Sequence, residues 1–372
     1  MRLLFAGGGT GGHIYPAVSI AKAVKARYPE AEILFVGAER GMETDLVPRE
    51  GFRLETIRVV GLARRNPVAA LRSLVLAAQG LIRARRIVRE FQPDVAVGTG
   101  GYVSGPAILA AALGSVPVLI HEQNAFPGLT TRALSRYATV VAVNFPEAID
   151  RLPRARRTAV TGQPIRPDFY RVEREAARRL LQIPADAEVI MSVGGSGGAL
   201  RINQAVLQAA EQLLAQENRL LLQITGRRDY EQVKARAEQL ALSPAVRLRW
   251  RIIPFMYEMP EALGAADLVI SRAGASTLEE VAAVGVPALI IPSPNVTDNH
   301  QEHNANSLAR RGAAVVIRDS LLDHRTLLEN VNAILGDAAK RAAMAAASRQ
   351  AGHPRATEDL LDLILELAGS NA

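Results

Sequence analysis

The sequence of 372 residues contains no cysteine, which excludes a disulfide framework, a cysteine-bound metal and a cysteine nucleophile. Aromatic residues are also few, at 4% of the total. No apolar run approaches the roughly 18 residues of a membrane-spanning helix. The short run after Met1 predicts a first strand rather than a signal peptide. Together these absences predict a cytoplasmic protein.

Lysine is scarce as well, because only four of the 44 basic residues are lysines and arginine supplies the rest. Residues 1–165 contain 21 basic and 12 acidic residues, a net charge of +9, whereas residues 166–372 contain 23 and 25, a net charge of −2. The asymmetry indicates an anionic partner for the first half, such as a nucleic acid, a phosphorylated lipid or a membrane surface. A GC-rich genome, which favours arginine codons, explains the arginines without any partner.

The composition that is present, 49% hydrophobic and 22% charged, is globular, and the length favours two domains. Short apolar runs alternate with helical patterns, which predicts the α/β class with parallel sheets covered on both faces. The predicted strands are Leu3–Ala6, Ile33–Val36, Val95–Gly98, Val116–His121, Val140–Val143, Val189–Val193, Leu220–Thr225, Ala245–Ile253, Leu268–Ser271 and Ala288–Ile291. The predicted helices include Pro16–Arg27, Ala107–Leu113, Ile202–Leu214 and Leu360–Leu367.

A stretch rich in proline and arginine, Leu152–Phe169, interrupts this alternation and is the predicted linker. Both halves begin with a strand, a glycine loop and a helix, a repeat on the scale of a domain. We therefore expect two doubly wound, Rossmann-like domains facing each other across a cleft, with ligands at the carboxyl ends of the strands. The predicted domains are residues 1–163 and 164–345, followed by a closing helical segment, 346–372.

A glycine loop, Gly7–Gly12, follows the first predicted strand and leads directly into His13. The loop contains the pattern GxGxxG, but the second strand lacks the acidic residue at its end that a nicotinamide dinucleotide site requires. Glycines at a helix N-terminus nevertheless let the backbone approach an anion where the helix dipole is positive. His13 is then either a base or a capping or buried histidine, and the residues alone leave both interpretations open.

Two polar loops in the second half also suit a ligand. The second glycine loop, Gly194–Gly198, adds the hydroxyl of Ser196 to its backbone amides, which suits a diphosphate, although a tight turn without a ligand has the same appearance. The loop Pro292–Asn304 is dense in amide and imidazole groups, which suit the hydroxyls of a sugar.

Between these loops, Ser271–Val281 joins a strand to a helix through a glycine turn. Ser276 and Thr277 are candidate N-caps, so the segment is explained either as an ordinary capping box or as an anion site. In the second case Glu279 or Glu280, in the first turn, would bind the vicinal hydroxyls of a ribose.

Six motifs occur in one order along the chain: Gly8–Pro16, Gly100–Pro106, His121–Asn124, Gly194–Ala199, Arg272–Glu280 and Asn299–Asn304. Together they closely resemble the peptidoglycan N-acetylglucosaminyltransferase family, from Met1 to about Gly312. The resemblance implies a GT-B enzyme that transfers N-acetylglucosamine from UDP to the muramoyl 4-hydroxyl of undecaprenyl-diphosphate-linked N-acetylmuramoyl pentapeptide. That reaction converts lipid I to lipid II for cell-wall synthesis, cell shape and division. The resemblance further implies no cofactor and a peripheral location on the cytoplasmic face of the cell membrane.

The resemblance also implies roles for individual residues, with His13 as the base for the acceptor hydroxyl. Glu280 corresponds to the ribose carboxylate, and Met256 offers its backbone to uracil. Two positions depart from the family: Gln163–Arg166 retains only the Pro and Arg of Asn-Pro-Val-Arg, and His300 stands where some members carry a second glutamine. The full set implied to contact UDP-N-acetylglucosamine is Thr10, Gly11, Gly12, Asn124, Arg166, Ser196, Met256, Ala275, Ser276, Thr277, Leu278, Glu279, Glu280 and Gln301.

No Asp-x-Asp sequence occurs, so the usual cation-binding motif of metal-dependent glycosyltransferases is missing. We therefore expect a metal-independent enzyme, in which helix N-termini and Arg166 stabilise the charge of the leaving UDP. Inversion of the anomeric centre needs one base near the attacking hydroxyl, and His13 suits that role.

Residues 58–89 contain eight arginines and no acidic residue, and several apolar residues among them share one helical face. The segment is either a helix packed on its own sheet with solvated arginines or a patch that contacts an anionic membrane. The lipid-linked acceptor favours the membrane, and no interleaved aromatic residue supports binding of nucleic acid. The candidate membrane contacts are Arg64, Arg65, Leu71, Arg72, Val75, Ile82, Arg83 and Arg86.

Two rival functions remain. A UDP-N-acetylglucosamine 2-epimerase shares the nucleotide-binding half of the fold and needs no lipid. A nucleotide-sensing or scaffold protein would bind the UDP-sugar without turnover. Dependence of UDP release on the lipid acceptor separates the transferase from the epimerase.

Overall fold

The computed structural model describes residues 1–60, 67–195 and 198–369 and divides the chain into two compact units. Unit 1 comprises Met1–Ile165 and Arg355–Ala372, and unit 2 comprises Arg166–Pro354. The chain first passes from unit 1 to unit 2 after Ile165, two residues beyond the expected domain boundary at residue 163. The segment 346–372 does not form one piece, because its first part belongs to unit 2 and its last part to unit 1.

Unit 1 contains a seven-stranded parallel sheet with the strand order β3-β2-β1-β4-β5-β6-β7. Leu3 of the central strand lies opposite Ile33 on one neighbour and Val95 on the other. The order reverses between β1 and β4, which makes the sheet doubly wound. The strands are β1 (Arg2–Gly7), β2 (Glu32–Ala38), β3 (Arg53–Ile57), β4 (Val95–Gly100), β5 (Val118–Glu122), β6 (Val140–Val143) and β7 (Thr158–Val160).

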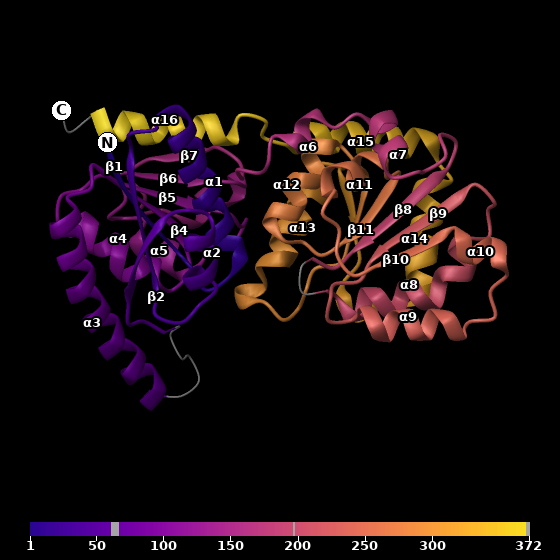
Figure 1. Cartoon of the computed structure of the whole chain (residues 1–372), viewed down its shortest axis with the longest axis horizontal. Helices are drawn as coiled ribbons and strands as arrows, with labels where there is room; N and C mark the ends of the chain where they lie inside the picture. Colours follow the sequence, from indigo (N-terminus) through magenta and orange to yellow (C-terminus); the bar gives the residue numbers. More distant parts are fainter. Residues whose placement is uncertain (61–66, 196–197, 370–372) are drawn as a thin grey trace. The chain divides into compact units, whose positions relative to one another are not determined.

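Helices cover both faces of this sheet. Because successive side chains of a strand alternate between faces, Leu3 and Phe5 enter one core while Leu4 and Ala6 enter the other. The first core contains α1 and the C-terminal α16, which lies among the N-terminal elements in Figure 1, and the second contains α3, α4 and α5. The helices are α1 (Gly11–Arg27), α2 (Glu43–Arg49), α3 (Pro67–Phe91), α4 (Ser104–Leu113), α5 (Leu129–Leu134) and α16 (Ala356–Gly369), with a 3-10 turn at Pro146–Arg151.

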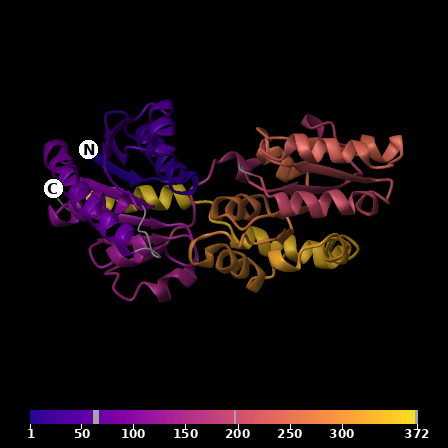
Figure 2. The ribbon, with the colours of Figure 1, turned by 90° about the horizontal axis from the view of Figure 1, so that it is seen from below.

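Unit 2 contains a six-stranded parallel sheet in the order β10-β9-β8-β11-β12-β13, between helical layers (Figure 2). Its strands are β8 (Glu188–Val193), β9 (Arg219–Ile224), β10 (Trp250–Ile253), β11 (Leu268–Ser271), β12 (Ala288–Ile290) and β13 (Ala314–Val316). Its helices are α6 (Asp168–Arg171), α7 (Arg174–Leu180), α8 (Leu200–Leu213), α9 (Tyr230–Gln239), α10 (Pro244–Leu248), α11 (Met259–Ala265), α12 (Ala275–Val284), α13 (His300–Arg310), α14 (His324–Leu335) and α15 (Ala338–Ala351), with 3-10 turns at Thr297–Asn299 and Asp319–Leu321.

The prediction of two doubly wound α/β domains is confirmed, with local corrections. The predicted strand Ala245–Ile253 is wrong over its first half, because Pro244 occupies the first turn of α10 and Ser243 Oγ caps that helix by accepting from Val246 N. The predicted linker contains β7 and the start of α6. The helix predicted from Pro16 begins at Gly11, since a proline near a helix start removes few internal hydrogen bonds.

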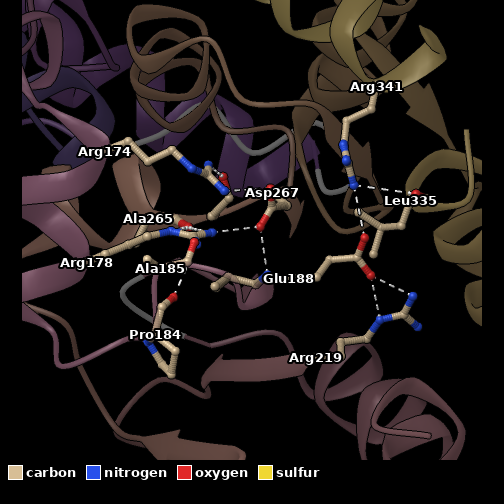
Figure 3. Close-up of polar contacts among 12 residues, drawn as sticks. Arg174, Arg178, Pro184, Ala185, Glu188, Arg219, Ala265, Asp267, Leu335 and Arg341 are labelled. Atoms are coloured by element: carbon tan, nitrogen blue, oxygen red, sulfur yellow. Dashed lines mark hydrogen bonds and ion pairs between the residues drawn. The ribbon is translucent and has the colours of Figure 1, made fainter. Parts of the chain in front are cut away.

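Two carboxylates and four arginines form ion pairs at the amino ends of the strands in unit 2 (Figure 3). Asp267 accepts from Arg174 at 2.6 Å, from Arg178 at 3.0 Å and from the backbone N of Val189 at 2.8 Å. The guanidinium of Arg178 is 6% exposed and also donates to the backbone carbonyl oxygens of residues 184, 185 and 265. Asp267 therefore joins α7 to β8 and β11.

Glu188 forms the second half of this network, accepting from Arg219 at 2.7 Å and from Arg341 at 2.9 Å. The Arg219 side chain is 3% exposed, so its charge is compensated almost entirely by Glu188 and by backbone and amide oxygens. Since a buried arginine without its carboxylate is costly, loss of the carboxylate of either pair should destabilise unit 2.

We expect Asp267→Ala to lower the free energy of unfolding of unit 2 by about 3–5 kcal/mol, because it leaves the buried Arg178 uncompensated. The only tryptophan, Trp250, is buried in unit 2, so its fluorescence during denaturant unfolding reports on that unit. Glu175→Ala, which removes a 3.8 Å surface pair with Arg179, is the control and should change little. Equal stabilities of the two variants would contradict the structural role of Asp267.

Candidate functional site

The predicted glycine loops lie where the strand order of each sheet reverses. In unit 1, the loop after β1 and the loop after β4 are neighbours at the carboxyl edge. In unit 2, the loops after β8 and β11 are likewise neighbours at the carboxyl edge of the sheet. Connections leave such a switch point in opposite directions, and the crevice that results is the usual ligand site of a doubly wound sheet. Each unit therefore has a candidate site at the point where its strand order reverses.

The two loops of unit 1 approach each other so closely that glycine is required. A Cβ on Gly101, which has a φ of +82°, would lie 2.2 Å from the carbonyl oxygen of Gly8. A Cβ on Gly7 would lie 2.1 Å from Oγ1 of Thr99, whose hydroxyl donates to the His13 carbonyl oxygen at 2.7 Å. These contacts hold the first turn of α1 against β4.

His13 lies half-buried in that first turn, beside the second loop. Its Nδ1 is 3.2 Å from the carbonyl oxygen of Gly8 and 3.3 Å from Oγ1 of Thr10. A carbonyl oxygen only accepts, so the contact with Gly8 favours the neutral tautomer with its hydrogen on Nδ1, in which Nε2 is the basic nitrogen. The Nε2 edge lies against Gly100, where a Cβ would be only 3.2 Å from Nε2. In this tautomer a His13 that acts as a general base does so through Nε2.

The donor-sugar candidate of unit 1, Asn124, is positioned by a buried carboxylate. Glu122, at the end of β5, is 3% exposed and accepts from Asn124 N at 3.1 Å, Asn124 Nδ2 at 3.2 Å and Gly128 N at 3.0 Å. These bonds occupy the carboxylate of Glu122, which therefore orients the side-chain amide of Asn124 and the loop that follows. Thr10, Gly11 and Gly12 lie around the start of α1, where Thr10 is the N-cap.

A cavity of about 780 Å³ lies at the carboxyl edge of unit 2. It is bounded by the loop after β8, the start of α12 and the loop after β12, and Gly274, Thr277 and Gln301 line it. This volume is that of an ordinary small-molecule site. Ser196 lies outside the described residues. Among those described, no cluster of three or more histidine, aspartate or glutamate side chains is arranged to hold a metal ion.

The start of α12 differs from the predicted capping box. Gly274 occupies the N-cap, the helix begins at Ala275, and no side-chain hydrogen bond caps it in the described chain. Ser276 and Thr277 therefore lie inside the first turn, and the prediction that they are N-caps is wrong. Since the first-turn N–H groups have no acceptor within the helix, this end of α12 is suited to a phosphate.

The two adjacent glutamates of α12 have different environments. Glu279 is 4% exposed and accepts from Tyr170 Oη at 3.0 Å and from His353 N at 2.7 Å, so it joins α12 to the first and last segments of unit 2. Glu280 has no hydrogen-bond partner within the described residues. Its burial raises its pKa from 4.5 to about 7, an effect that the positive charge of Arg166 opposes. Of the two carboxylates, Glu280 is the one with hydrogen-bonding capacity left for a ligand.

Gln301 connects the loops around the cavity. Its Oε1 accepts from Ala273 N at 3.3 Å and from Ser293 N at 2.8 Å, so the amide orientation is set by the backbone on both sides. Asn304 Nδ2, one turn further along α13, donates to the Ala273 carbonyl oxygen at 3.2 Å. The start of α13 thereby fixes the loop that precedes α12.

Sequence analysis missed an aromatic cluster next to Met256, the residue expected near uracil. Met256 itself is buried, whereas Phe255 and Tyr257 are exposed, with ring centroids 4.9 Å apart. The Arg227 guanidinium lies 5.0 Å from the centroid of Phe255 and donates to Tyr257 Oη at 3.0 Å. The sequence signal that could have indicated this cluster is the pair of aromatic residues on either side of Met256, directly after β10. Arg166 likewise lies over an aromatic ring, that of Phe169, at 5.2 Å.

From Pro67 onward, the basic segment lies in the long helix α3 of unit 1 (Figure 1). Val75 and Ile82 are 50% and 71% exposed on it, while Arg83 pairs with Glu55 and Arg86 with Glu90. Arg64 and Arg65, and the side chains of Leu71 and Arg72, lie outside the described residues. None of the described helices is both long enough and apolar enough to span a bilayer.

Comparison with known proteins matches both units to one family. Residues 3–143 match the glycosyltransferase family 28 N-terminal domain, and residues 189–360 match the family 28 C-terminal domain. Two relatives carry the name UDP-N-acetylglucosamine–N-acetylmuramyl-(pentapeptide) pyrophosphoryl-undecaprenol N-acetylglucosamine transferase. The one from Desulforudis audaxviator is 45% identical over 99% of both chains, and the one from Moorella thermoacetica is 45% identical over 100% of both.

Solved structures agree with this match. The chain is similar to MurG of Acinetobacter baumannii, with a TM-score of 0.80, 31% identity and coverage of 98% of this chain and 99% of the other. It also resembles a UDP-N-acetylglucosamine 2-epimerase from Neisseria meningitidis bound to UDP-N-acetylglucosamine, with a TM-score of 0.67 over 98% of this chain and all of the other. At 14% identity, this second likeness shows the fold alone.

We expect Glu280→Gln to change the pH dependence of stability. Because the folded pKa of about 7 lies above the reference value of 4.5, the stability that Glu280 contributes is full below pH 4.5 and is lost as the pH rises through 7. The free energy of unfolding of the variant should therefore exceed that of the wild type, by about 3 kcal/mol at about pH 8. Unfolding followed by Trp250 fluorescence measures the difference. Glu211→Gln, an exposed site on α8, is the control, and parallel curves for Glu280→Gln and the wild type would exclude the raised pKa.

Proposed function

Because the chain belongs to glycosyltransferase family 28, we propose that it transfers N-acetylglucosamine from UDP-N-acetylglucosamine to a lipid-linked muramoyl pentapeptide. The observation that carries the proposal is the full-length similarity, at 45% identity, to transferases named for that reaction. The acceptor is then undecaprenyl-diphosphate-N-acetylmuramoyl pentapeptide, lipid I, and the product is lipid II of peptidoglycan. The epimerase function is not favoured, since its likeness extends to the fold alone.

The donor site of the proposal lies in unit 2. The N-terminus of α12 meets the diphosphate, Glu280 accepts from the ribose hydroxyls, and the backbone beside Met256 meets uracil. The Gln301 side chain lines the cavity, and its oxygen is already held by two backbone N–H groups. That arrangement leaves the amide nitrogen as the group that can donate to a sugar hydroxyl. Arg166 supplies positive charge beside Glu280.

Unit 1 supplies the base. His13 Nε2 takes the proton of the acceptor 4-hydroxyl as that oxygen forms a bond to the anomeric carbon of N-acetylglucosamine. The bond from this carbon to the diphosphate oxygen breaks, and UDP leaves with the electron pair. One displacement inverts the anomeric centre, and preorganised N–H groups stabilise the charge that develops on UDP. The tautomer held by the Gly8 carbonyl supports this role.

We further propose that α3 contacts the anionic cytoplasmic face of the membrane that carries the acceptor. The exposed Val75 and Ile82 would enter the headgroup region, with the arginines of residues 58–89 over anionic lipid. Arg83 and Arg86 each pair with one glutamate, so part of their charge is already compensated. The excess of arginine in this segment over the acids around it favours anionic lipid.

The reaction is tested by incubating the enzyme with radiolabelled UDP-N-acetylglucosamine, with and without lipid I, and separating the lipid and nucleotide fractions. We expect label in the lipid fraction and UDP release only when lipid I is present. Conversion of the UDP-sugar to its 2-epimer without lipid I would instead establish the epimerase. Binding without turnover in either condition would establish a UDP-sugar-binding protein.

His13→Ala is expected to lower kcat by roughly 10²–10⁴-fold, the usual effect of removing a general base, with the affinity for UDP-N-acetylglucosamine nearly unchanged. Steady-state kinetics and calorimetry of donor binding measure the two quantities. His324→Ala, in unit 2, controls for the loss of any imidazole. A fall in kcat of less than about fivefold would assign the base to another residue.

Membrane contact predicts co-sedimentation with anionic liposomes at low salt and release at high salt, because the Debye length falls from about 10 Å at 0.1 M to about 3 Å at 1 M. Replacing Arg64, Arg65, Arg83 and Arg86 with glutamate should abolish binding, and Ile82→Glu should weaken it, with UDP affinity retained in both. Leu248→Glu, at an 82% exposed leucine of unit 2, is the matched control. Equal binding to neutral and anionic vesicles would show that the arginines form only a solvated face.

A further inference from the structure

Glu43, the first residue of α2, is a carboxylate buried in unit 1 with 0% exposure. Its Oε2 accepts from Gly9 N at 3.1 Å, and its Oε1 accepts from Ala38 N at 3.0 Å. Gly9 belongs to the loop after β1 and Ala38 ends β2, so one side chain joins the carboxyl ends of two neighbouring strands. Burial of a carboxylate is costly without such bonds, and both oxygens of Glu43 have one.

Glycines surround this carboxylate on three sides. A Cβ on Gly8 would lie 2.5 Å from Oε1, and one on Gly37 would lie 2.8 Å from Cγ. A Cβ on Gly41 would meet Oε2 at less than hydrogen-bonding distance. The carboxylate thus fills the space that the missing side chains leave, and the position of Gly8 depends on it.

The loop that contains Gly8 leads into the first turn of α1, where His13 lies. The carbonyl oxygen of Gly8 contacts His13 Nδ1 at 3.2 Å, so the residue that packs on Glu43 also sets the orientation and tautomer of the imidazole. The loop after β4 is coupled to the carboxylate too, since burial and the charge of Glu43 both raise the pKa of Tyr102. The ring of Tyr102 lies 3.0 Å from a Cβ built on Gly9.

We propose that Glu43 is a positioning residue of the transfer reaction, which holds the first glycine loop so that Gly8 orients His13. The inference rests on the proposed function in one respect, the role of His13 as base. An ionised carboxylate is required because both of its oxygens accept from backbone N–H groups. A glutamine would direct its NH₂ group at one of these donors, and an aspartate would be too short to reach both.

The test compares Glu43→Gln and Glu43→Asp with the wild type in kinetics and in an NMR titration of His13. The His13 C2–H signal is assigned by its absence from the spectrum of His13→Ala. For Glu43→Gln we expect kcat to fall by about 10–100-fold, as expected for a displaced catalytic group, and the KM for UDP-N-acetylglucosamine to stay within about twofold. Loss of the negative charge and of the ordered Gly8 carbonyl should lower the pKa of His13 and move the acidic limb of the kcat profile with it. Glu43→Asp, which keeps the charge, should recover part of both effects.

Asp45→Asn is the matched control, because Asp45 lies on the same helix, is 58% exposed and pairs only with Arg49 in the described structure. It should leave both kcat and the His13 titration unchanged. A general loss of stability would reduce the amount of active enzyme without moving the titration of His13, so the two readouts separate positioning from folding.

A folded Glu43→Gln enzyme with a wild-type His13 titration overturns the proposal, whatever its kcat. If that variant does not fold, Gly8→Ala replaces it, since its Cβ presses on the Glu43 carboxylate and should shift the His13 titration in the folded protein. An unchanged titration in Gly8→Ala also overturns the proposal. A shifted titration combined with an active His13→Ala enzyme would leave the coupling in place and overturn only the role of His13 as base.

Discussion

The loop after β4 lies so close to the loop after β1 that Gly101 cannot carry a side chain, because its Cβ would lie 2.2 Å from the Gly8 carbonyl oxygen. This approach is a consequence of the parallel sheet, in which the order of strands reverses and adjacent connections diverge. Because the loops pack backbone against backbone, the first turn of α1 and the imidazole of His13 take their positions from main-chain atoms. In unit 2 the loop after β8 is tight within itself, since a Cβ on Gly194 would lie 2.3 Å from Ala199 N. A rigid sheet edge thereby presents amides whose directions are set before any ligand arrives.

The fold could be predicted because its strongest signals are local. Strands buried on both faces appear as continuous apolar runs, and Val140–Val143 and Leu268–Ser271 are found at their predicted bounds. The strands that were missed carry weaker signals: β3 (Arg53–Ile57) has polar alternate residues, and β7 and β13 have three residues each. The division of the chain was harder to predict, since the return of α16 to unit 1 depends on contacts between residues more than 300 positions apart, which no local pattern encodes.

The candidate site could likewise be predicted only in part. Glycine loops and the acidic pair of α12 can be recognised as motifs in the sequence. The motifs do not show which of the two glutamates already accepts hydrogen bonds from the protein's own groups. Tyr170 and His353, which bind Glu279, lie over 70 residues away on either side, so only the structure distinguishes Glu279 from Glu280. Glu43 escaped notice for a similar reason. Its segment has no distinctive motif, and its burial follows from glycines in the loop after β1, in β2 and just before α2.

The position of α16 has a consequence for how the protein is made. Leu360 and Ile364 of that helix are fully buried in the core that also contains Phe5 and the inner face of α1, yet they leave the ribosome more than 300 residues after Phe5. One apolar face of the unit 1 sheet is therefore covered only after α16 has been synthesised, and every element of unit 2 precedes α16 in the chain. Vectorial synthesis thus allows the second unit to complete its fold before the first. Until then the apolar face that α16 covers stays exposed, and exposed apolar surface makes a nascent chain prone to aggregation.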